Sequence, residues 1–439
     1  MTIIGDSFSM LTKPEQRAGS QAAQFPLSAF EFVALMALLM ALTALSVDVM
    51  LPALPQIGRS LGVANGNDRQ LVVSIYLGGF ALGQLIFGPI SDRFGRKPPL
   101  LFGLAFYIFG TVLAASSSSF AGLLAARVLQ GMGAAAPRVI AVAIVRDRFE
   151  GREMSRVMSF IIMVFIVVPI VAPGVGEGIL QFSGWRSIFV LLLGVALGSG
   201  LWATLRLPET RRAGDRLPLS PGALWHAVKL VALTRQTLGY VIATGFMFGL
   251  LISYVMSSEQ IFVEVYGLGA AFPIAFGSIA AFMIAASLLN ASAVRKLGMR
   301  GISHATLFAG LAACAVMAFL GFPEKPPLLL FCGFMATVFF CFGIIMPNFN
   351  ALAMEPMAHV AGTASSVAGF YTTGAGAIFG TLIGRSFEGG VRPLCIGIAL
   401  LFIATLAVVL VTERFKLMQA KTALSPHLLE QEENAADRS

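Results

Sequence analysis

The sequence predicts an all-α membrane protein, with twelve transmembrane helices arranged as two six-helix halves. Of its 439 residues, 57% are hydrophobic and 12% are charged, whereas soluble proteins average about 25% charged residues. Twelve apolar segments can be distinguished, and each is close to the ~20 residues that a membrane-spanning helix needs. The longest internal polar stretch, at about 206–236, divides these segments six and six.

The segments are predicted to be helices because backbone polar groups in lipid must be satisfied within the segment itself. Charged residues, prolines or glycines bound most of them. The first follows a polar stretch without the pattern of a cleavable signal peptide, so we expect it to remain in the mature protein. The segments lie at about 30–53, 70–90, 99–118, 121–145, 157–182, 187–205, 237–263, 271–293, 301–322, 327–349, 361–384 and 391–412.

The distribution of basic residues predicts the orientation of the chain. The loops and tails on one side of the predicted bundle carry 22 Lys and Arg residues, and the opposite loops carry 6. Because basic residues favour the cytoplasmic side, we expect both termini to be cytoplasmic. Within the linker, the stretch from Leu219 to Leu233 either lies along the membrane surface or is a plain connection. The predicted parts are an N-terminal tail (1–28), a first half (29–206), a linker (207–236), a second half (237–413) and a C-terminal tail (414–439).

The loop after the second segment is short and basic, with the sequence GPISDRFGRK at residues 88–97. Its glycines permit a tight turn, and its basic residues favour the cytoplasmic face. The loop resembles the signature G-x-x-x-D-R-x-G-R-K of the major facilitator superfamily, carried here by Gly88, Asp92, Arg93, Gly95, Arg96 and Lys97. The resemblance implies a cytoplasmic gate in which Asp92 is bonded to basic residues at the end of the fourth helix, such as Arg146. Alternatively, the loop only orients the chain.

An acidic residue, Asp48, lies inside the first apolar segment. A charged side chain at a helix centre costs about 2.5–3.5 kcal/mol on membrane-insertion scales, so an acid there is a candidate functional group. The run DVMLPALP at residues 48–55 looks like the first helix of the Bcr/CflA multidrug branch of the superfamily. The resemblance implies that Asp48 takes part in proton coupling. The alternative is a polar residue near the outer mouth, satisfied by water or Ser46.

Two arginines lie within the fourth segment. The run RVLQGMG from Arg127 is similar to the family pattern R-x-x-Q-G-x-G, whose arginine is tied to proton transfer. Arg138 follows eleven residues later, which at ~3.6 residues per turn places it within ~20° of Arg127 on the helix. We therefore expect Arg127, Gly131 and Arg138, with the neighbouring Gln130, to form a stripe that lines a central cavity. Alternatively, Arg138 reaches the membrane surface or forms an ion pair between helices.

The fifth segment contains the run PIVAPGVGEG at residues 169–178. It resembles the antiporter signature G-P-x-x-G-G around Pro173 and Gly176, with Ala172 in place of the first glycine and Glu177 in place of the last. Small residues here permit close helix packing. Glu177 is a second intramembrane acid, which we expect either to pair with Arg127 or Arg138 or to titrate. Alternatively, it faces the outer vestibule, since it lies near the end of the segment at Trp185.

The eleventh segment carries Gly376, Gly380 and Gly384 at four-residue spacing. This spacing gives a smooth helix face suited to tight or sliding contact, so these glycines are expected to pack helices together. Glu259 and Glu264, at the end of the seventh segment, are expected at the outer interface.

Several classes of function are disfavoured by the sequence. It has no Walker-A pattern, so ATP is not expected to drive the protein. Its basic residues concentrate in short loops, which argues against nucleic-acid binding. Its cysteines lie in apolar segments and are expected to be small buried side chains. No cofactor and no enzymatic activity are predicted, because the sequence contains no enzyme signature. No metal site is predicted either, because the histidines are scattered; they are His226, His304, His359 and His427.

The sequence therefore favours a proton-coupled antiporter, similar to the Bcr/CflA branch, that exports small toxic or drug-like compounds by alternating access. Its expected partners are a small-molecule substrate, protons and the lipid bilayer, and we expect a monomer in a bacterial inner membrane. One alternative is a metabolite exporter or importer on the same fold. The other is a membrane receptor or scaffold that transports nothing.

Overall fold

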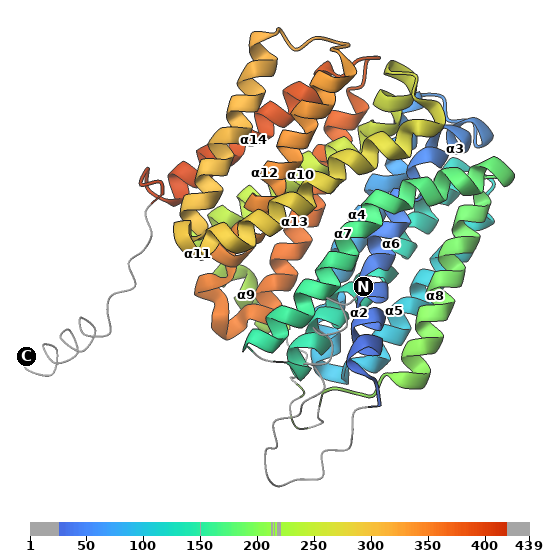
Figure 1. The fold of residues 1–439 in the computed structure, drawn as a ribbon. Helices are drawn as coiled ribbons and strands as arrows, with labels where there is room; N and C mark the ends of the chain where they lie inside the picture. Colours follow the sequence, from blue (N-terminus) through green and yellow to red (C-terminus); the bar gives the residue numbers. More distant parts are fainter. Residues whose placement is uncertain (1–25, 150, 212–213, 215, 217–220, 419–439) are drawn as a thin grey trace, which may run out of the picture.

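A computed structural model describes residues 26–149, 151–211, 214, 216 and 221–418 of the chain. The remaining parts of the predicted tails and linker lie outside the described residues. All regular structure in the described part is helical (Figure 1). The long helices are α2 (Ala29–Asp48), α4 (Leu71–Phe94), α5 (Lys97–Ala115), α6 (Phe120–Arg148), α7 (Gly151–Phe182), α8 (Arg186–Arg206), α10 (Arg235–Glu259), α11 (Phe272–Phe319), α12 (Leu328–Met354), α13 (Ala361–Arg385) and α14 (Arg392–Thr412).

Shorter helical elements connect the long helices or extend them. The chain continues beyond α2 with helical backbone angles at Val49 and Met50, through a 3₁₀ turn and α3. A π-helical turn, η5, extends α10. The short elements are η2 (Leu51–Ala53), α3 (Leu54–Ser60), η3 (Gly66–Gln70), α9 (Pro221–Leu233), η5 (Gln260–Val265), η6 (Gly269–Ala271) and η7 (Glu355–Val360).

All twelve predicted segments lie on helices. Ten helical stretches in the described residues are long and apolar enough to cross a membrane. One of them contains α11, which holds both the eighth and the ninth predicted segments, and the fifth segment lies on α7. The helices of the structure therefore contain all twelve predicted spans, two of which lie on the single helix α11.

The merged helix is interrupted at Gly298. A straight helix of 48 residues would be about 72 Å long, more than twice the ~30 Å hydrocarbon core. Gly298 has φ 71° and ψ 159°, a combination that glycine adopts far more readily than other residues. A Cβ at this position would meet nothing within 4 Å, so the backbone angle, and not space, requires glycine here.

Helix contacts repeat between the two halves. In the first half α4 packs on α6, α2 on α7 and α5 on α8; in the second half the matching contacts are α11 on α12, α10 on α13 and α11 on α14. The halves meet where α4 packs on α13 and where α7 packs on α11. In Figure 1 the blue-to-green half lies beside the yellow-to-red half. Such a repeat is the arrangement of parallel duplicated halves in a transporter.

Glycines allow the closest helix contacts. A Cβ at Gly131 would overlap the backbone of α4 at Tyr76, and a Cβ at Gly176 would overlap the backbone carbonyl of Val49. In the second half, Gly376 lies against the Phe248 ring. Gly380 similarly faces α10. Close packing of small residues replaces the hydrophobic driving force that lipid does not supply.

Candidate functional site

A cavity of about 450 Å³ lies between the two halves. Eight long helices contribute to it: α2, α4, α6, α7, α10, α11, α12 and α13. Most of its wall is apolar, with aromatic and methionine side chains supplied mainly by the second half. These are Phe80, Phe248, Phe276, Phe339, Met283, Met346 and Met354. A mostly apolar cavity with a few polar groups is typical of small-molecule sites.

Two ionisable side chains line this cavity, Asp48 and Arg138. Asp48 is the last residue of α2 and only 5% exposed. Within the described residues it has no hydrogen bond or ion pair, although its carboxyl group borders the cavity. An intramembrane acid without a fixed partner is well placed to exchange a proton or to meet a ligand.

Arg127, in contrast, lies inside the first half and away from the cavity wall. Its side chain is fully buried, with Nε donating to the carbonyl of Val72 at 2.9 Å and Nη2 to that of Ser46 at 3.1 Å. Its guanidinium also lies 4.2 Å from the centre of the Tyr76 ring. Arg127 therefore holds α2 two residues before Asp48, which makes it a positioning residue for that segment.

The predicted stripe on α6 is divided by its surroundings. Gln130 bonds to Arg127 at 2.6 Å and to Thr111 at 2.9 Å, and it is fully buried. Gly131 lies against the backbone of α4. Neither lines the cavity, which corrects our expectation for these two residues; only Arg138 of the stripe does. Helical spacing places residues on one face, but α4 covers that face near Gly131 and leaves it open to the cavity near Arg138.

Glu177 is partly buried on α7 and does not line the cavity. The described structure contains no ion pair between Glu177 and either Arg127 or Arg138, so the expected pairing is absent. Arg127 is already satisfied by carbonyl groups of α2 and α4. The adjacent Pro173 is buried, and Gly176 packs on the carbonyl of Val49.

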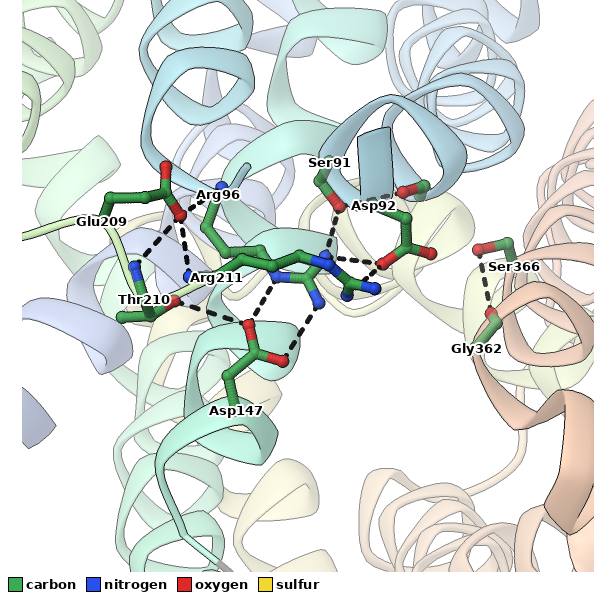
Figure 2. Close-up of polar contacts among 10 residues, drawn as sticks. Ser91, Asp92, Arg96, Asp147, Glu209, Thr210, Arg211, Gly362 and Ser366 are labelled. Atoms are coloured by element: carbon green, nitrogen blue, oxygen red, sulfur yellow. Dashed lines mark hydrogen bonds and ion pairs between the residues drawn. The ribbon is translucent and has the colours of Figure 1, made fainter. Parts of the chain in front are cut away.

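The loop at residues 88–97 forms an ion-pair cluster around Arg96 (Figure 2). The Arg96 side chain is 1% exposed and lies between two carboxylates, with Nη1 2.8 Å from Asp92 and Nε 2.6 Å from Asp147. Its backbone N–H donates to Glu209 at 2.7 Å. Burial alone would lower the pKa of Arg96, but the hydrogen bonds to Asp147 and Asp92 raise it above its usual value. The end of the bundle that contains this loop is called the Arg96 end below.

This cluster corrects the expected partner of Asp92. Asp92 is bonded to Arg96 and to Arg211, which follows α8, and not to Arg146. The Arg146 guanidinium instead lies beside Gly362, at the start of α13. Arg96 is closer to Asp92 in the chain, and it fills the position that the prediction gave to Arg146.

The other signature residues have different surroundings. Gly95 has φ 94°, and a Cβ there would come within 2.5 Å of the Glu209 carboxylate. Lys97 donates from Nζ to the carbonyl of Thr204 at 2.8 Å. Arg93 is exposed. A Cβ on Gly88 would overlap Ser366 of α13, so this glycine lies at the contact between the halves.

The second half contains a matching cluster around Arg300, which follows Gly298. Arg300 Nε lies 2.8 Å from Glu413, and Nη2 lies 3.8 Å from Glu355. Tyr240 also donates to Glu413 at 2.7 Å, and its hydroxyl lies 3.3 Å from Nε2 of His304. Burial alone would raise the pKa of Glu413, but the hydrogen bonds from Arg300 and Tyr240 lower it below its usual value.

Sequence reasoning missed the Arg300 cluster because its acids are distant in the chain. The repeat itself carried the signal. The Arg96 side chain pairs with an acid at the end of the fourth helix, and its backbone N–H donates to an acid that follows the sixth. The Arg300 side chain pairs with acids that follow the tenth and twelfth segments. Placing the two halves side by side would have predicted both acids.

At the opposite end of the bundle, polar contacts join the two halves. Arg69 of η3 pairs with Glu259 at 3.3 Å and also contacts Glu264. Asn67 bonds to the carbonyls of Arg385 and Phe387. This end is called the Arg69 end, and the contact surface is called the Arg69 seam; it consists of Asn67, Asp68, Arg69, Gln70, Glu259, Gln260, Glu264 and Arg385.

The cavity lining extends toward the Arg96 end as far as Met354 and Ser365, near the end of α12 and the start of α13. Among the residues that the structure describes, no group of three or more His, Cys, Asp or Glu side chains is arranged to hold a metal ion. The site is therefore built from apolar side chains, one acid, one arginine and several amide and hydroxyl groups.

Comparison with known proteins identifies the family. The family model described as Major Facilitator Superfamily matches residues 36–381. The chain belongs to the Major Facilitator Superfamily. It is a multi-pass membrane protein and a transporter of small molecules, not an enzyme.

Relatives with curated names are about 30% identical. A bicyclomycin resistance protein homolog of Haemophilus influenzae is 31% identical over 363 residues, covering 81% of this chain and 89% of the relative. An uncharacterized transporter of this superfamily from Bacillus subtilis, YdgK, is 32% identical over 80% of this chain and 87% of the relative. A chloramphenicol resistance protein of Pseudomonas aeruginosa is 31% identical over 74% and 77%.

Solved structures share the fold. The xylose transporter XylE of E. coli, in a partially occluded inward-open conformation, aligns with a TM-score of 0.68 at 13% identity, covering 90% of this chain and 99% of XylE. The human organic anion transporter MFSD10 aligns with a TM-score of 0.58 at 19% identity, covering 87% and 100%. At these identities the likeness concerns the fold alone.

Proposed function

We propose that this transporter exports small drug-like compounds in exchange for protons. The observation that carries the proposal is Asp48, a buried carboxyl group on the wall of the cavity between the halves that has no hydrogen bond or ion pair with any residue the structure describes. The superfamily moves solutes by alternating access around such a central site. The named resistance proteins among its relatives support the choice of drug-like compounds.

In the proposed cycle, a proton and the substrate act on Asp48 in turn. A ligand shifts a two-state equilibrium only if it binds one state better than the other. When Asp48 is protonated, its neutral carboxyl group suits the mostly apolar cavity wall. Loss of the proton creates a negative charge that a bound substrate or water must solvate. Arg127 keeps this part of α2 in place through the Ser46 carbonyl.

Arg138 and the apolar wall are proposed to select the substrate. The cavity offers one acid and one base on the first half, and phenylalanine and methionine side chains mostly on the second. This arrangement suits an amphipathic compound with a donor for Asp48, an acceptor for Arg138 and an apolar body. The substitution Arg138→Met removes this positive charge and should weaken export of compounds that carry an acidic group or a strong hydrogen-bond acceptor.

The topology completes the proposal. Both termini are assigned to the cytoplasm of a bacterial inner membrane, because of the excess of basic residues in that set of loops. The Arg96 end is then cytoplasmic and the Arg69 end faces outward. We propose that a monomer is sufficient, since the cavity is formed within one chain. The clusters at residues 88–97 and around Arg300 are proposed to steady each half during the rocking motion.

A metabolite carrier remains the second candidate, favoured by the presence of both Asp48 and Arg138 in the cavity. One acid and one base in a small cavity also suit a zwitterionic metabolite. A scaffold without transport would need neither group, and neutralising Asp48 would leave its function intact.

Growth of a bacterial host that lacks its own efflux pumps tests the proposal. Cells expressing the wild type, Asp48→Asn or Glu177→Gln at matched membrane levels are challenged with a panel that includes chloramphenicol and bicyclomycin. We expect the wild type to raise tolerance to some compounds, and Glu177→Gln to do the same because Glu177 lies outside the cavity. Asp48→Asn should raise tolerance to none. If the wild type raises tolerance to no compound, the metabolite carrier becomes the leading hypothesis. Equal protection by all three proteins would remove Asp48 from the mechanism.

A further inference from the structure

The segment that follows α14 breaks the helix and packs against the second half. It is called the C-terminal latch and consists of residues 414–418. Arg414, Phe415 and Met418 have positive φ, at 52°, 61° and 63°. This left-handed region is sterically disfavoured for residues other than glycine. The conformation of the latch therefore depends on the contacts that hold it.

The last two residues of the latch join it to the bundle. Leu417 packs against the hydrophobic core. The backbone N–H of Met418 donates to Nδ1 of His304, on α11, at 3.2 Å. The side chains at 414–416 are exposed. His304 is thus a buried side chain whose hydrogen bond holds a strained segment in place.

The bond from Met418 fixes the proton of His304. His304 is fully buried. A backbone N–H can only donate, so Nδ1 accepts and carries no proton, and the proton of the neutral imidazole is on Nε2. Nε2 lies 3.3 Å from the hydroxyl oxygen of Tyr240, which can accept this proton because its own is donated to Glu413. The docked latch therefore requires a neutral His304.

The groups that face His304 come from each element packed around it. Tyr240 belongs to α10, and Arg300 lies one turn before His304 on α11. Arg300 pairs with Glu413, after α14, and with Glu355 of η7. The sequence of α12 has no charged side chain. The latch adds two exposed basic side chains, Arg414 and Lys416.

These neighbours leave the hydrogen bond to Met418 as the deciding contact. A cationic His304 would be attracted by Glu413 but repelled by Arg300, and these two already form an ion pair at 2.8 Å. A proton on Nδ1 would meet the Met418 N–H, donor against donor. Protonation therefore removes a contact on which the latch depends.

We propose that His304 is a pH switch that holds the C-terminal latch when neutral and releases it when Nδ1 takes up a proton from the cytoplasm. The released imidazole reaches water, where its charged form is solvated and its pKa is about 6.5. The docked form binds one proton fewer. Docking should therefore be complete above about pH 6.5 and weaken as the pH falls below it.

The switch is separate from the transport cycle. Asp48 lines the cavity between the halves, whereas His304 joins α11 to the segment after α14 within one half. Only the assignment of this end to the cytoplasm rests on the proposed function. Release of the latch is measured without a substrate, so a failure of drug export would leave the switch intact.

Hydrogen exchange of the latch amides tests the switch. The full chain in lipid nanodiscs is exchanged at about pH 8 to about pH 5, and mass spectrometry gives protection factors corrected for the intrinsic effect of pH on exchange. Protection of the latch should fall by up to about tenfold per pH unit below about pH 6.5. Protection of Leu207–Arg211, which follows α8 and has no histidine, should stay constant. The pKa of Glu413 lies below its usual value, so this acid stays ionised throughout.

Histidine variants assign the proton. In His304→Asn the amide oxygen can accept from Met418 but does not titrate, so protection should no longer depend on pH. His226→Asn and His427→Asn remove other histidines and should keep the dependence. Wild-type protection that is absent at pH 8 or unchanged down to pH 5 would overturn the proposal, even if His304→Asn does not fold. Persistence of the dependence in folded His304→Asn, or its loss in either control, would also overturn it.

Discussion

The two ends of the molecule use ion pairs differently. At the Arg96 end, two ion-pair clusters of the described residues each lie within one half, around Arg96 in the first and around Arg300 in the second. At the Arg69 end, ion pairs of the Arg69 seam cross between the halves. Pairs within a half strengthen a rigid body, whereas pairs between halves hold one conformation of a two-state system. The ion pairs of the Arg69 seam therefore join the halves, whereas those around Arg96 and Arg300 each stabilise one half.

The largest expected effect on stability comes from Arg96→Met. Removing this buried cation leaves Asp147 without its ion-pair partner, and breaking a buried pair typically costs about 3–5 kcal/mol. We expect a clear fall in the melting temperature of the purified protein in detergent, measured by thermal denaturation. Arg206→Met is the matched control, since the Arg206–Glu31 pair in the same half is solvent-exposed and such pairs contribute little to stability. Equal falls in melting temperature in the two variants would contradict the claim that the buried ion pairs of Arg96 stabilise the protein more than the exposed pair does.

The seam is tested by Arg69→Met, which should change conformation more than stability. We expect a cysteine placed at Leu77, on the cavity wall, to react with a membrane-impermeant maleimide from the outer side several-fold faster in Arg69→Met. Arg392→Met provides the control, because Arg392 pairs with Glu324 at the same end but within one half. A comparable increase in Arg392→Met would mean that the cross-half pairs have no special role.

Packing inside a half is tested by Gly131→Ala. The added methyl group would overlap the backbone at Tyr76, and overpacking typically costs about 1–3 kcal/mol. Gly78→Ala, on the adjoining helix, is the control because a Cβ there meets nothing within 4 Å. We expect thermal stability to fall only in Gly131→Ala; unchanged stability would show that α4 and α6 can move apart at little cost.

The smallest effect is expected from Tyr240→Phe in the Arg300 cluster. The change removes one hydrogen bond to Glu413 but leaves the ion pair with Arg300. A hydrogen bond to a charged group contributes about 1.5–3 kcal/mol at most, and Arg300 compensates part of this. A small loss of thermal stability with unchanged maleimide reactivity at the Arg69 end is the predicted result, and a shift in that reactivity would tie the two ends together.

Local signals in the sequence predicted the helices and singled out Asp48. Continuous apolar segments reveal spans because lipid leaves the backbone no other partner, and an acid within such a segment is conspicuous. The structure places that acid on the cavity wall. The role of Asp48 in proton coupling stays a prediction.

Partners across the chain were harder to predict. Helical spacing gave Arg127 and Arg138 the same face, but only the neighbouring helices decide which of them reaches the cavity. Asp92 was expected to bond Arg146, since the sequence shows charges but not their distances. Arg69 was counted only as a loop charge, because its partner acids lie about 190 residues away.

Proton movement driven by a transported compound tests the central claim most directly. Everted membrane vesicles are acidified inside. Chloramphenicol, or a compound to which the protein raised tolerance in the growth assay, is then added while a pH-sensitive dye reports the pH of the interior. The account predicts that the wild type and Glu177→Gln release protons when the compound is added, and that Asp48→Asn does not. Proton release by Asp48→Asn equal to that of the wild type would contradict the account.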